Sequence, residues 1–245
     1  MTERLDAVEI KVNFTGARAD AALAVLGLLG DGERRQIYFG EDLTGHTTLP
    51  LLDDGVILRV RRTPDGDDVT VKLRPCDRAR LILPWTEMRK EDEHSFRLEE
   101  DWSGTRQVLA ASLVASRDSG RLDGALAGRA SPRRLFSGRH RRFLTDCAAV
   151  PVRYDRLSVL GPVQARKWDT VEWSGFEVAA ERWAVADLDF LELSLRVPPE
   201  AAAAAQEGFG TALRVAGLDS DTAQETKTRL VLQRLALAHA IAATA

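Results

Sequence analysis

Apolar and polar residues alternate along many stretches of the chain, as expected of β-strands that bury one face. Turn sequences separate some of these stretches, and Pro64-Asp65-Gly66-Asp67 predicts a hairpin. The alternation therefore predicts a protein rich in antiparallel sheet. The predicted strands cover residues 7–14, 33–39, 56–62, 69–73, 85–89, 95–97, 149–153, 155–160, 165–173, 175–185 and 190–197.

Other segments have helical character. Residues 104–127 are rich in alanine and leucine, which predicts a helical insertion at about 104–128. Residues 199–216 begin with proline and end before Gly217, the usual places for these residues at helix ends. A second C-terminal helix is predicted over 221–243. No linker rich in proline or serine interrupts the chain, so residues 1–245 are expected to form a single α+β domain.

The polar faces of the predicted strands carry pairs of charged residues. Glu9 and Lys11 lie two positions apart, as do Arg59 and Arg61, so each pair points to one side of its strand. Taken alone, Glu9 and Lys11 fit an exposed ion pair of little energetic weight. If several such faces turn inward together, their charges need partners or a ligand. Arginine and lysine both suit phosphate, so the pattern predicts a cationic anion-binding interior.

The overall composition of the chain limits the classes of partner that it is expected to bind. The chain has 34 basic and 37 acidic residues and a net charge of −3, which gives no general attraction to nucleic acid or membranes. The basic segment 129–142 fits a solvated loop and the start of a strand, with a tunnel arginine or a nucleic-acid patch as alternatives. Phe136 and Phe143 interleave its arginines, but two phenylalanines in an amphipathic segment are more typical of a core than of base stacking, which disfavours nucleic acid. Cys76, Cys147 and the four histidines lack metal-ligand spacing. No apolar run reaches the roughly 20 residues of a membrane span, so a cytoplasmic protein is expected.

The order of the charged motifs resembles that of the CYTH superfamily, also called the triphosphate tunnel metalloenzymes. The resemblance extends from about residue 7 to about residue 232. It implies an α+β fold with an antiparallel eight-stranded β-barrel, the triphosphate tunnel, and flanking helices. Members of the superfamily include thiamine triphosphatases, inorganic triphosphatases and class IV adenylate cyclases. The matching fragments are Glu9-Ile10-Lys11, Tyr38-Phe39, Arg59-Val60-Arg61, Val69-Thr70-Val71-Lys72, Leu160-Gly161, Phe190-Leu191-Glu192-Leu193 and Thr226-Lys227-Thr228.

The same resemblance implies a role for each matching residue. The residues that would bind the triphosphate are Lys11, Arg59, Arg61, Lys72 and Lys227, joined by a mid-chain arginine among Arg139, Arg141 and Arg142. The ligands of a magnesium or manganese ion would be Glu9, Glu87 and Glu192. The catalytic carboxylates would be Glu9, Glu192 and Glu181.

The sequence departs from the family pattern in its acidic half. Ala7 stands where the family begins a Glu-x-Glu-x-Lys strand, and Ser194 stands where a late strand usually has its second glutamate. The segment Glu87-Met88-Arg89 has one acid where two are common. The cations expected to bind an anion are kept, while the carboxylates expected to bind a metal are reduced. Fewer carboxylates weaken a divalent-cation site.

Three functional hypotheses fit this pattern. The first is metal-dependent hydrolysis of an inorganic or organic triphosphate. The second is a module that binds a small phosphorylated or polyphosphate ligand without turnover, and the losses at Ala7 and Ser194 favour it. The third is a tunnel recruited to another reaction on a phosphorylated or diphosphorylated substrate. All three share a cationic tunnel as the binding site.

Overall fold

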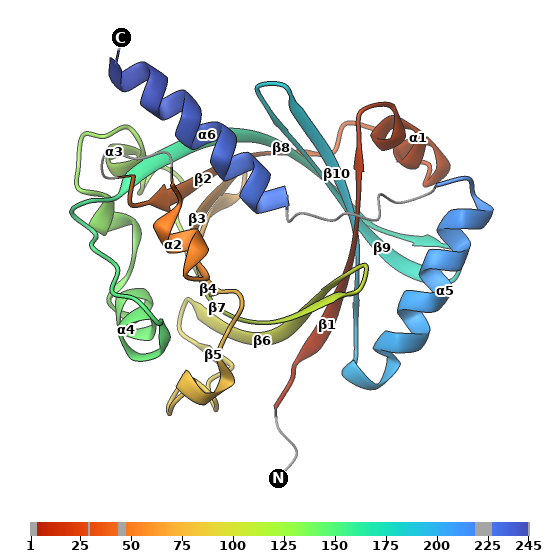
Figure 1. Cartoon of the computed structure of the whole chain (residues 1–245), viewed down its shortest axis with the longest axis horizontal. Coiled ribbons are helices and arrows are strands. Elements are labelled where there is room, and N and C mark those ends of the chain that lie inside the picture. Colours follow the sequence, from red (N-terminus) through yellow and green to blue (C-terminus); the bar gives the residue numbers. More distant parts are fainter. Residues whose placement is uncertain (1–3, 29, 44–47, 219–226, 245) are drawn as a thin grey trace.

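The strands form one sheet that closes on itself into a barrel, seen along its opening in Figure 1. The computed structural model describes residues 4–28, 30–43, 48–218 and 227–244. Around the barrel the strands follow the order β1, β10, β9, β8, β2, β3, β4, β7 and β6, and β5 extends the sheet beside β6. The strands are β1 (Ala7–Thr15), β2 (Glu33–Glu41), β3 (Val56–Thr63), β4 (Gly66–Leu73), β5 (Lys90–Glu91), β6 (His94–Ser103), β7 (Arg106–Arg117), β8 (Ser158–Trp173), β9 (Phe176–Val185) and β10 (Leu188–Val197).

The barrel differs from the expected eight antiparallel strands. Within the described residues, nine strands complete the ring, and one pair of neighbours is parallel: β1 pairs with β6, Ala7 opposite Glu99. The cause is geometric, because eight successive antiparallel pairings lead from β1 to β6 and leave these two strands running in the same direction. The α+β barrel is thus confirmed, and its predicted strand number and purely antiparallel pairing are corrected.

The predicted helical insertion at 104–128 is wrong over its first half. Residues Arg106–Arg117 form β7, which pairs with β4 on one side and β6 on the other. Leu113 is fully buried against the outer core, while Val114 lines the interior. Pairing on both edges outweighs the helix propensity of alanine and leucine. Helix forms only at α3 (Asp123–Leu126).

Helices pack around the ring of strands, and α6 (Lys227–Thr244) crosses the ring and begins over its opening (Figure 1). The helices are α1 (Ala17–Val25), α2 (Pro50–Asp53), α3, α4 (Gly138–Cys147), α5 (Ala202–Val215) and α6. The last two occupy much of the predicted C-terminal helices, although the predicted helical residues 221–226 lie outside the described part of the chain. Among the described residues, no helix is long and apolar enough to cross a membrane.

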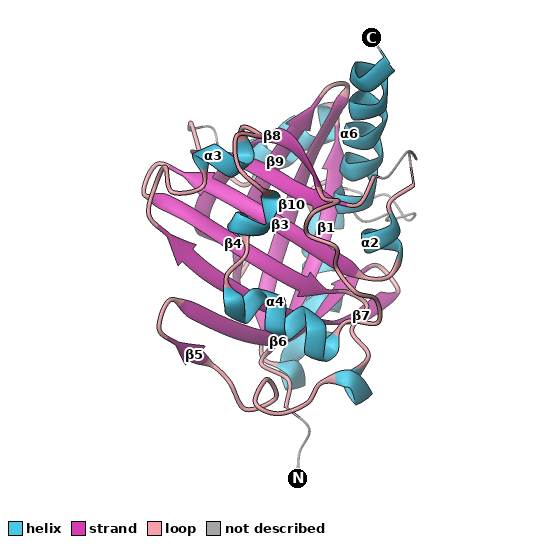
Figure 2. Cartoon of the chain, turned by 90° about the vertical axis from the view of Figure 1, so that its left-hand side faces the viewer, coloured by secondary structure: helices cyan, strands magenta, loops and turns pink. Residues whose placement is uncertain are grey.

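Two apolar cores lie between the outer face of the barrel and the helices. One packs Phe136 and Phe143, from the segment containing α4, against β3, β4, β6 and β7, on the side of the molecule shown in Figure 2. The other packs Phe209 of α5 and Leu23 of α1 against β1, β9 and β10. Because the outward-facing residues of the strands supply these cores, the inward-facing positions are free to carry charge.

A third apolar cluster lies partly inside the barrel. Phe39, Ile57 and Trp183 face the interior and pack with Val231 and Leu232 of α6. The helix thereby covers an apolar end of the tunnel and brings its first residue to the charged part. The interior of the barrel is thus apolar at the end that α6 covers and charged in the cavity.

Candidate functional site

The barrel encloses a cavity of about 530 Å³ with charged walls. Among the described residues, ten basic and six acidic side chains line it, so the walls carry an excess of positive charge. The basic residues are Lys11, Arg35, Arg59, Arg61, Lys72, Arg74, Arg97, Lys167, Arg196 and Lys227. The acidic residues are Glu9, Asp68, Glu99, Glu177, Glu181 and Glu192.

Arg59 and Arg61 form a cationic pair on β3. Arg59 donates a hydrogen bond to Thr70 Oγ1 at 3.2 Å, and Arg61 lies 3.4 Å from a carboxylate oxygen of Asp68. Within the described residues, the buried Nε atoms of both arginines have no hydrogen-bond partner. Burial, and then the neighbouring Arg61, lower the pKa of Arg59 to about 10. The pair therefore offers unused donors to an anion in the cavity.

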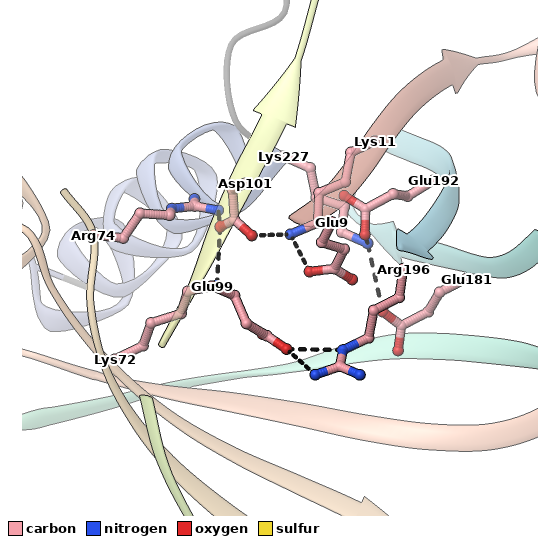
Figure 3. A network of polar contacts seen from close by, with 10 residues as sticks. All are labelled: Glu9, Lys11, Lys72, Arg74, Glu99, Asp101, Glu181, Glu192, Arg196 and Lys227. Atoms are coloured by element: carbon pink, nitrogen blue, oxygen red, sulfur yellow. Dashed lines mark hydrogen bonds and ion pairs between the residues drawn. The ribbon is translucent and has the colours of Figure 1, made fainter. Parts of the chain in front are cut away.

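Asp101 on β6 is the shared partner of three cations. Its carboxylate accepts hydrogen bonds from Lys11 and Lys72, both at 2.9 Å, and from Arg74 at 3.0 Å (Figure 3). Burial alone would raise the pKa of Asp101, but the three cations outweigh it and hold that pKa well below its usual range. Asp101 thus fixes the positions of lysines that the sequence predicts as phosphate ligands.

Lys227 lies between two facing carboxylates. Its ammonium is 3.1 Å from Glu192 Oε1 and 3.5 Å from Glu181 Oε2, and its Nζ lies 4.1 Å from the ring centroid of Trp183. Glu181 and Glu192 are opposite each other on β9 and β10. Burial opposes ionisation of Glu181, but Lys227 and then Arg61 and Arg59 lower its pKa to about 2. Glu181 is therefore ionised, and the Lys227 ammonium contacts both carboxylates.

Two further acids of the cavity, Glu9 and Glu99, are also paired with cations. Lys11 Nζ lies 2.7 Å from Glu9 Oε2 in addition to its contact with Asp101. Arg196 contacts Glu99 through two nitrogens, at 2.8 Å and 2.7 Å (Figure 3). Burial opposes ionisation of Glu9, but Lys11 and Lys72 lower its pKa in spite of the charge on Asp101. The carboxylates of Glu9 and Glu99 are therefore neutralised by neighbouring cations.

The residues present do not fit a resident magnesium or manganese ion. In the described part of the chain, no three carboxylate, imidazole or thiol groups are gathered where a metal could bind. Glu9, predicted as a metal ligand, contacts Lys11, and Glu192 contacts Lys227. Glu87, the third predicted ligand, is exposed in a turn and does not line the cavity. The expected strand at 85–89 is absent there, so no alternation directs Glu87 inward.

The mid-chain arginines lie outside the barrel. Arg139 on α4 pairs with Glu91 and Asp92, and Arg142 is an exposed partner of Asp146. Arg141 donates to the backbone carbonyl of Phe136. None of the three lines the cavity, because the segment folds as an outer helix whose aromatic residues enter the core. Their predicted contact with a triphosphate is therefore not supported by their position.

The other predicted residues do meet in the cavity. The structure brings together Glu9, Lys11, Arg59, Arg61, Lys72, Glu181, Glu192 and Lys227. Sequence reasoning missed Arg35, Arg74 and above all Asp101, whereas Arg196 shares the strand face of Glu192 in the sequence and also lines the cavity. The signal for Asp101 was present, because Arg97, Glu99 and Asp101 occupy every second position along β6.

Comparisons with known proteins support the fold. No protein-family model and no curated protein matches the sequence. Among solved structures, the chain is similar to a candidate adenylate cyclase from Bacillus halodurans, with 13% identity, a TM-score of 0.61, and coverage of 94% of this chain and 98% of that one. It is also similar to a candidate adenylyl cyclase from Hippeastrum described as having a dominant triphosphatase activity, with 14% identity, a TM-score of 0.59, and coverage of 92% and 94%. The chain thus has the triphosphate tunnel fold that its motifs predict.

Proposed function

We propose that the tunnel binds a triphosphate or a comparable multiply phosphorylated anion. The observation that carries the proposal is the Arg59–Arg61 pair, whose buried Nε donors have no partner among the described residues of a cavity with excess positive charge. An arginine fork binds phosphate oxygens through two parallel donors, which favours this class of anion over chloride or a monocarboxylate. The cavity volume of about 530 Å³ suits a small ligand.

The contacts of the wall cations assign them different parts in this binding. Lys11, Lys72 and Arg74 are neutralised in part by Asp101. They would contribute positive potential without moving far. Arg59 and Arg61 have more unused donors and would make the direct contacts. The affinity for the anion then depends mainly on Arg59 and Arg61, and to a smaller extent on Lys11, Lys72 and Arg74.

Titration with tripolyphosphate in the presence of EDTA tests this function. We expect saturable binding to the wild type by isothermal titration calorimetry, weakened about 100-fold or more in an Arg59→Ala/Arg61→Ala variant, because each charged hydrogen-bonding group contributes about 1.5–3 kcal/mol. Arg62→Ala is the matched control, since Arg62 pairs with Asp67 and Asp123 outside the cavity. Equal losses in the control and the double variant would show that binding depends on general charge and not on the tunnel.

Hydrolysis of the bound triphosphate is a second candidate function. Glu181 and Glu192 lie in the same cavity as the arginine pair, and the similar Hippeastrum protein is described as a triphosphatase. Metal-dependent hydrolysis, the first hypothesis from the sequence, is less well supported, because Lys227 occupies the space between the two carboxylates.

Phosphate release distinguishes binding from hydrolysis. Tripolyphosphate, ATP and thiamine triphosphate are each incubated with the chain in magnesium, manganese or EDTA. Release that disappears in Arg59→Ala/Arg61→Ala and persists in Arg62→Ala would establish a hydrolase and identify its substrate class. Binding by calorimetry with no release of phosphate would establish a non-hydrolytic binding tunnel.

A further inference from the structure

The ammonium of Lys227 is a cation fixed inside the tunnel. Lys227 is the first residue of α6, and only 6% of its side chain is exposed. Its Nζ contacts one oxygen of Glu181 and one of Glu192 (Figure 3). The aromatic face of Trp183 lies against the same ammonium, which adds a cation–π contact. The charge is therefore held from three sides by groups of β9 and β10.

The two glutamates need a cation at this point. They face each other across a pair of antiparallel strands, where directly opposed side chains stand close together and like charges repel. Both are largely buried, with side-chain exposures of 17% and 18%, so water screens the repulsion poorly. A divalent ion held by two carboxylates is one solution to this problem, and a lysine ammonium is another.

We propose that Lys227 serves as a built-in counter-ion in the place between Glu181 and Glu192 where a divalent cation would otherwise bind. As a result, the tunnel binds its phosphorylated anion without recruiting magnesium or manganese. This inference deepens the proposed function and rests on it for the identity of the anion. The binding of a divalent cation between Glu181 and Glu192 can nevertheless be measured with no anion present.

The contacts of the neighbouring acids support this assignment. Glu9 and Asp101, the other carboxylates near the site, share Lys11 as a partner, so they do not supply free ligands to a metal. Removing the Lys227 ammonium would leave Glu181 and Glu192 facing each other, and among the described residues their only remaining ion pair would be the longer contact of Arg35 to the other oxygen of Glu181, at 3.9 Å. Two carboxylates completed by water are a sufficient ligand set for a hydrated divalent ion.

Manganese binding to the full chain tests the inference directly. Free Mn²⁺ is measured by electron paramagnetic resonance in phosphate-free buffer, with wild type, Lys227→Ala and Lys227→Gln. We expect the wild type to bind Mn²⁺ at least tenfold more weakly than either variant. Arg229→Ala is the matched control on the same helix, because Arg229 pairs with Asp53 away from the carboxylates and its loss removes the same charge.

Two further measurements make the result specific. The gained site should disappear in Lys227→Ala/Glu192→Gln, and Mn²⁺ should raise the unfolding temperature of Lys227→Ala but not that of Arg229→Ala. Lys227→Gln keeps a hydrogen-bond donor in the buried site and serves if the alanine variant does not fold. Wild-type Mn²⁺ binding as tight as in the variants, or no gain in either variant, would overturn the inference. Failure of wild type to bind tripolyphosphate would instead overturn the proposed function.

Discussion

Asp101 shows how one residue can organise the cationic wall of the tunnel. Three cations converge on its carboxylate, and Lys11 also contacts Glu9. Without that carboxylate, Lys11, Lys72 and Arg74 would be like charges in a confined space. An arrangement of this kind keeps the cations in place without a ligand, so the site proposed to bind the anion is largely preformed.

Asp101→Asn should therefore destabilise the protein. Breaking a buried charge cluster by removing one partner costs about 3–5 kcal/mol, because the remaining charges are left uncompensated. Urea unfolding of Asp101→Asn at pH 7 measures this loss, and Asp118→Asn at an exposed position is the control. Tripolyphosphate should recover more stability in Asp101→Asn than in the wild type, since the anion then supplies the missing charge. An unfolding midpoint equal to that of Asp118→Asn would contradict this role.

Glu181 predicts a particular dependence of stability on pH. Its pKa of about 2 in the folded protein lies below the ordinary value of 4.5, so the folded state favours the ionised form. The resulting stability is fully present above about pH 4.5 and is lost as the pH falls toward 2. Its upper limit is on the order of 3 kcal/mol. Glu181→Gln should reduce the decline in unfolding free energy between pH 5 and pH 3, and an unchanged slope would exclude the contribution.

Strand alternation located much of the site at the residue scale. Lys11, Arg59, Arg61 and Lys72 follow a period of two that places them on one face, and the closed barrel turns that face inward. The same local pattern cannot tell on which side of the sheet a helix such as α4 will pack. The family resemblance placed one arginine among Arg139, Arg141 and Arg142 inside the tunnel, and all three lie outside it.

At the scale of elements, a close contact joins β2 and β8. The pairing of these strands shifts register between Ile37 and Phe39, and Gly161 of β8 lies beside the shift with a φ of +126°. A β-carbon at Gly161 would lie 2.8 Å from the carbonyl oxygen of Ile37. The strands can approach this closely only because the residue is glycine.

Gly161→Ala should destabilise the barrel by about 1–3 kcal/mol, the usual cost of a backbone conformation that alanine disfavours. Gly210→Ala in α5 is the matched control, because a β-carbon there meets no atom within 4 Å in the described residues. That control should stabilise the helix by about 0.5–1 kcal/mol. Chemical unfolding of both variants gives the comparison, and a loss of stability in both to the same extent would contradict the role of Gly161.

Elements formed by long-range pairing were the hardest to predict. The sequence of β7 is rich in alanine and leucine and has few polar positions, so it lacks the alternation that identified β1 and β3. Its conformation depends on β4 and β6, which lie on either side of it. The hairpin of β3 and β4 was predictable because its turn and both strands are adjacent in the sequence.

For the whole molecule, closure of the sheet separates two environments. The outward side chains build apolar cores under the helices, and the inward ones build a cavity rich in cations. The overall balance of 34 basic and 37 acidic residues conceals this separation, because charge is distributed by position in the fold. Motif order predicted the tunnel, but the internal pairing of acids with lysines required the structure.

The most direct test of this account is a crystal structure of the chain with tripolyphosphate, grown in the presence of EDTA. The account predicts phosphate oxygens bound to Arg59 and Arg61 inside the barrel, with Lys227 still between Glu181 and Glu192. It is contradicted if the anion binds on the outer surface, for example at the arginines of α4. It is also contradicted if Lys227 leaves both carboxylates when the anion binds.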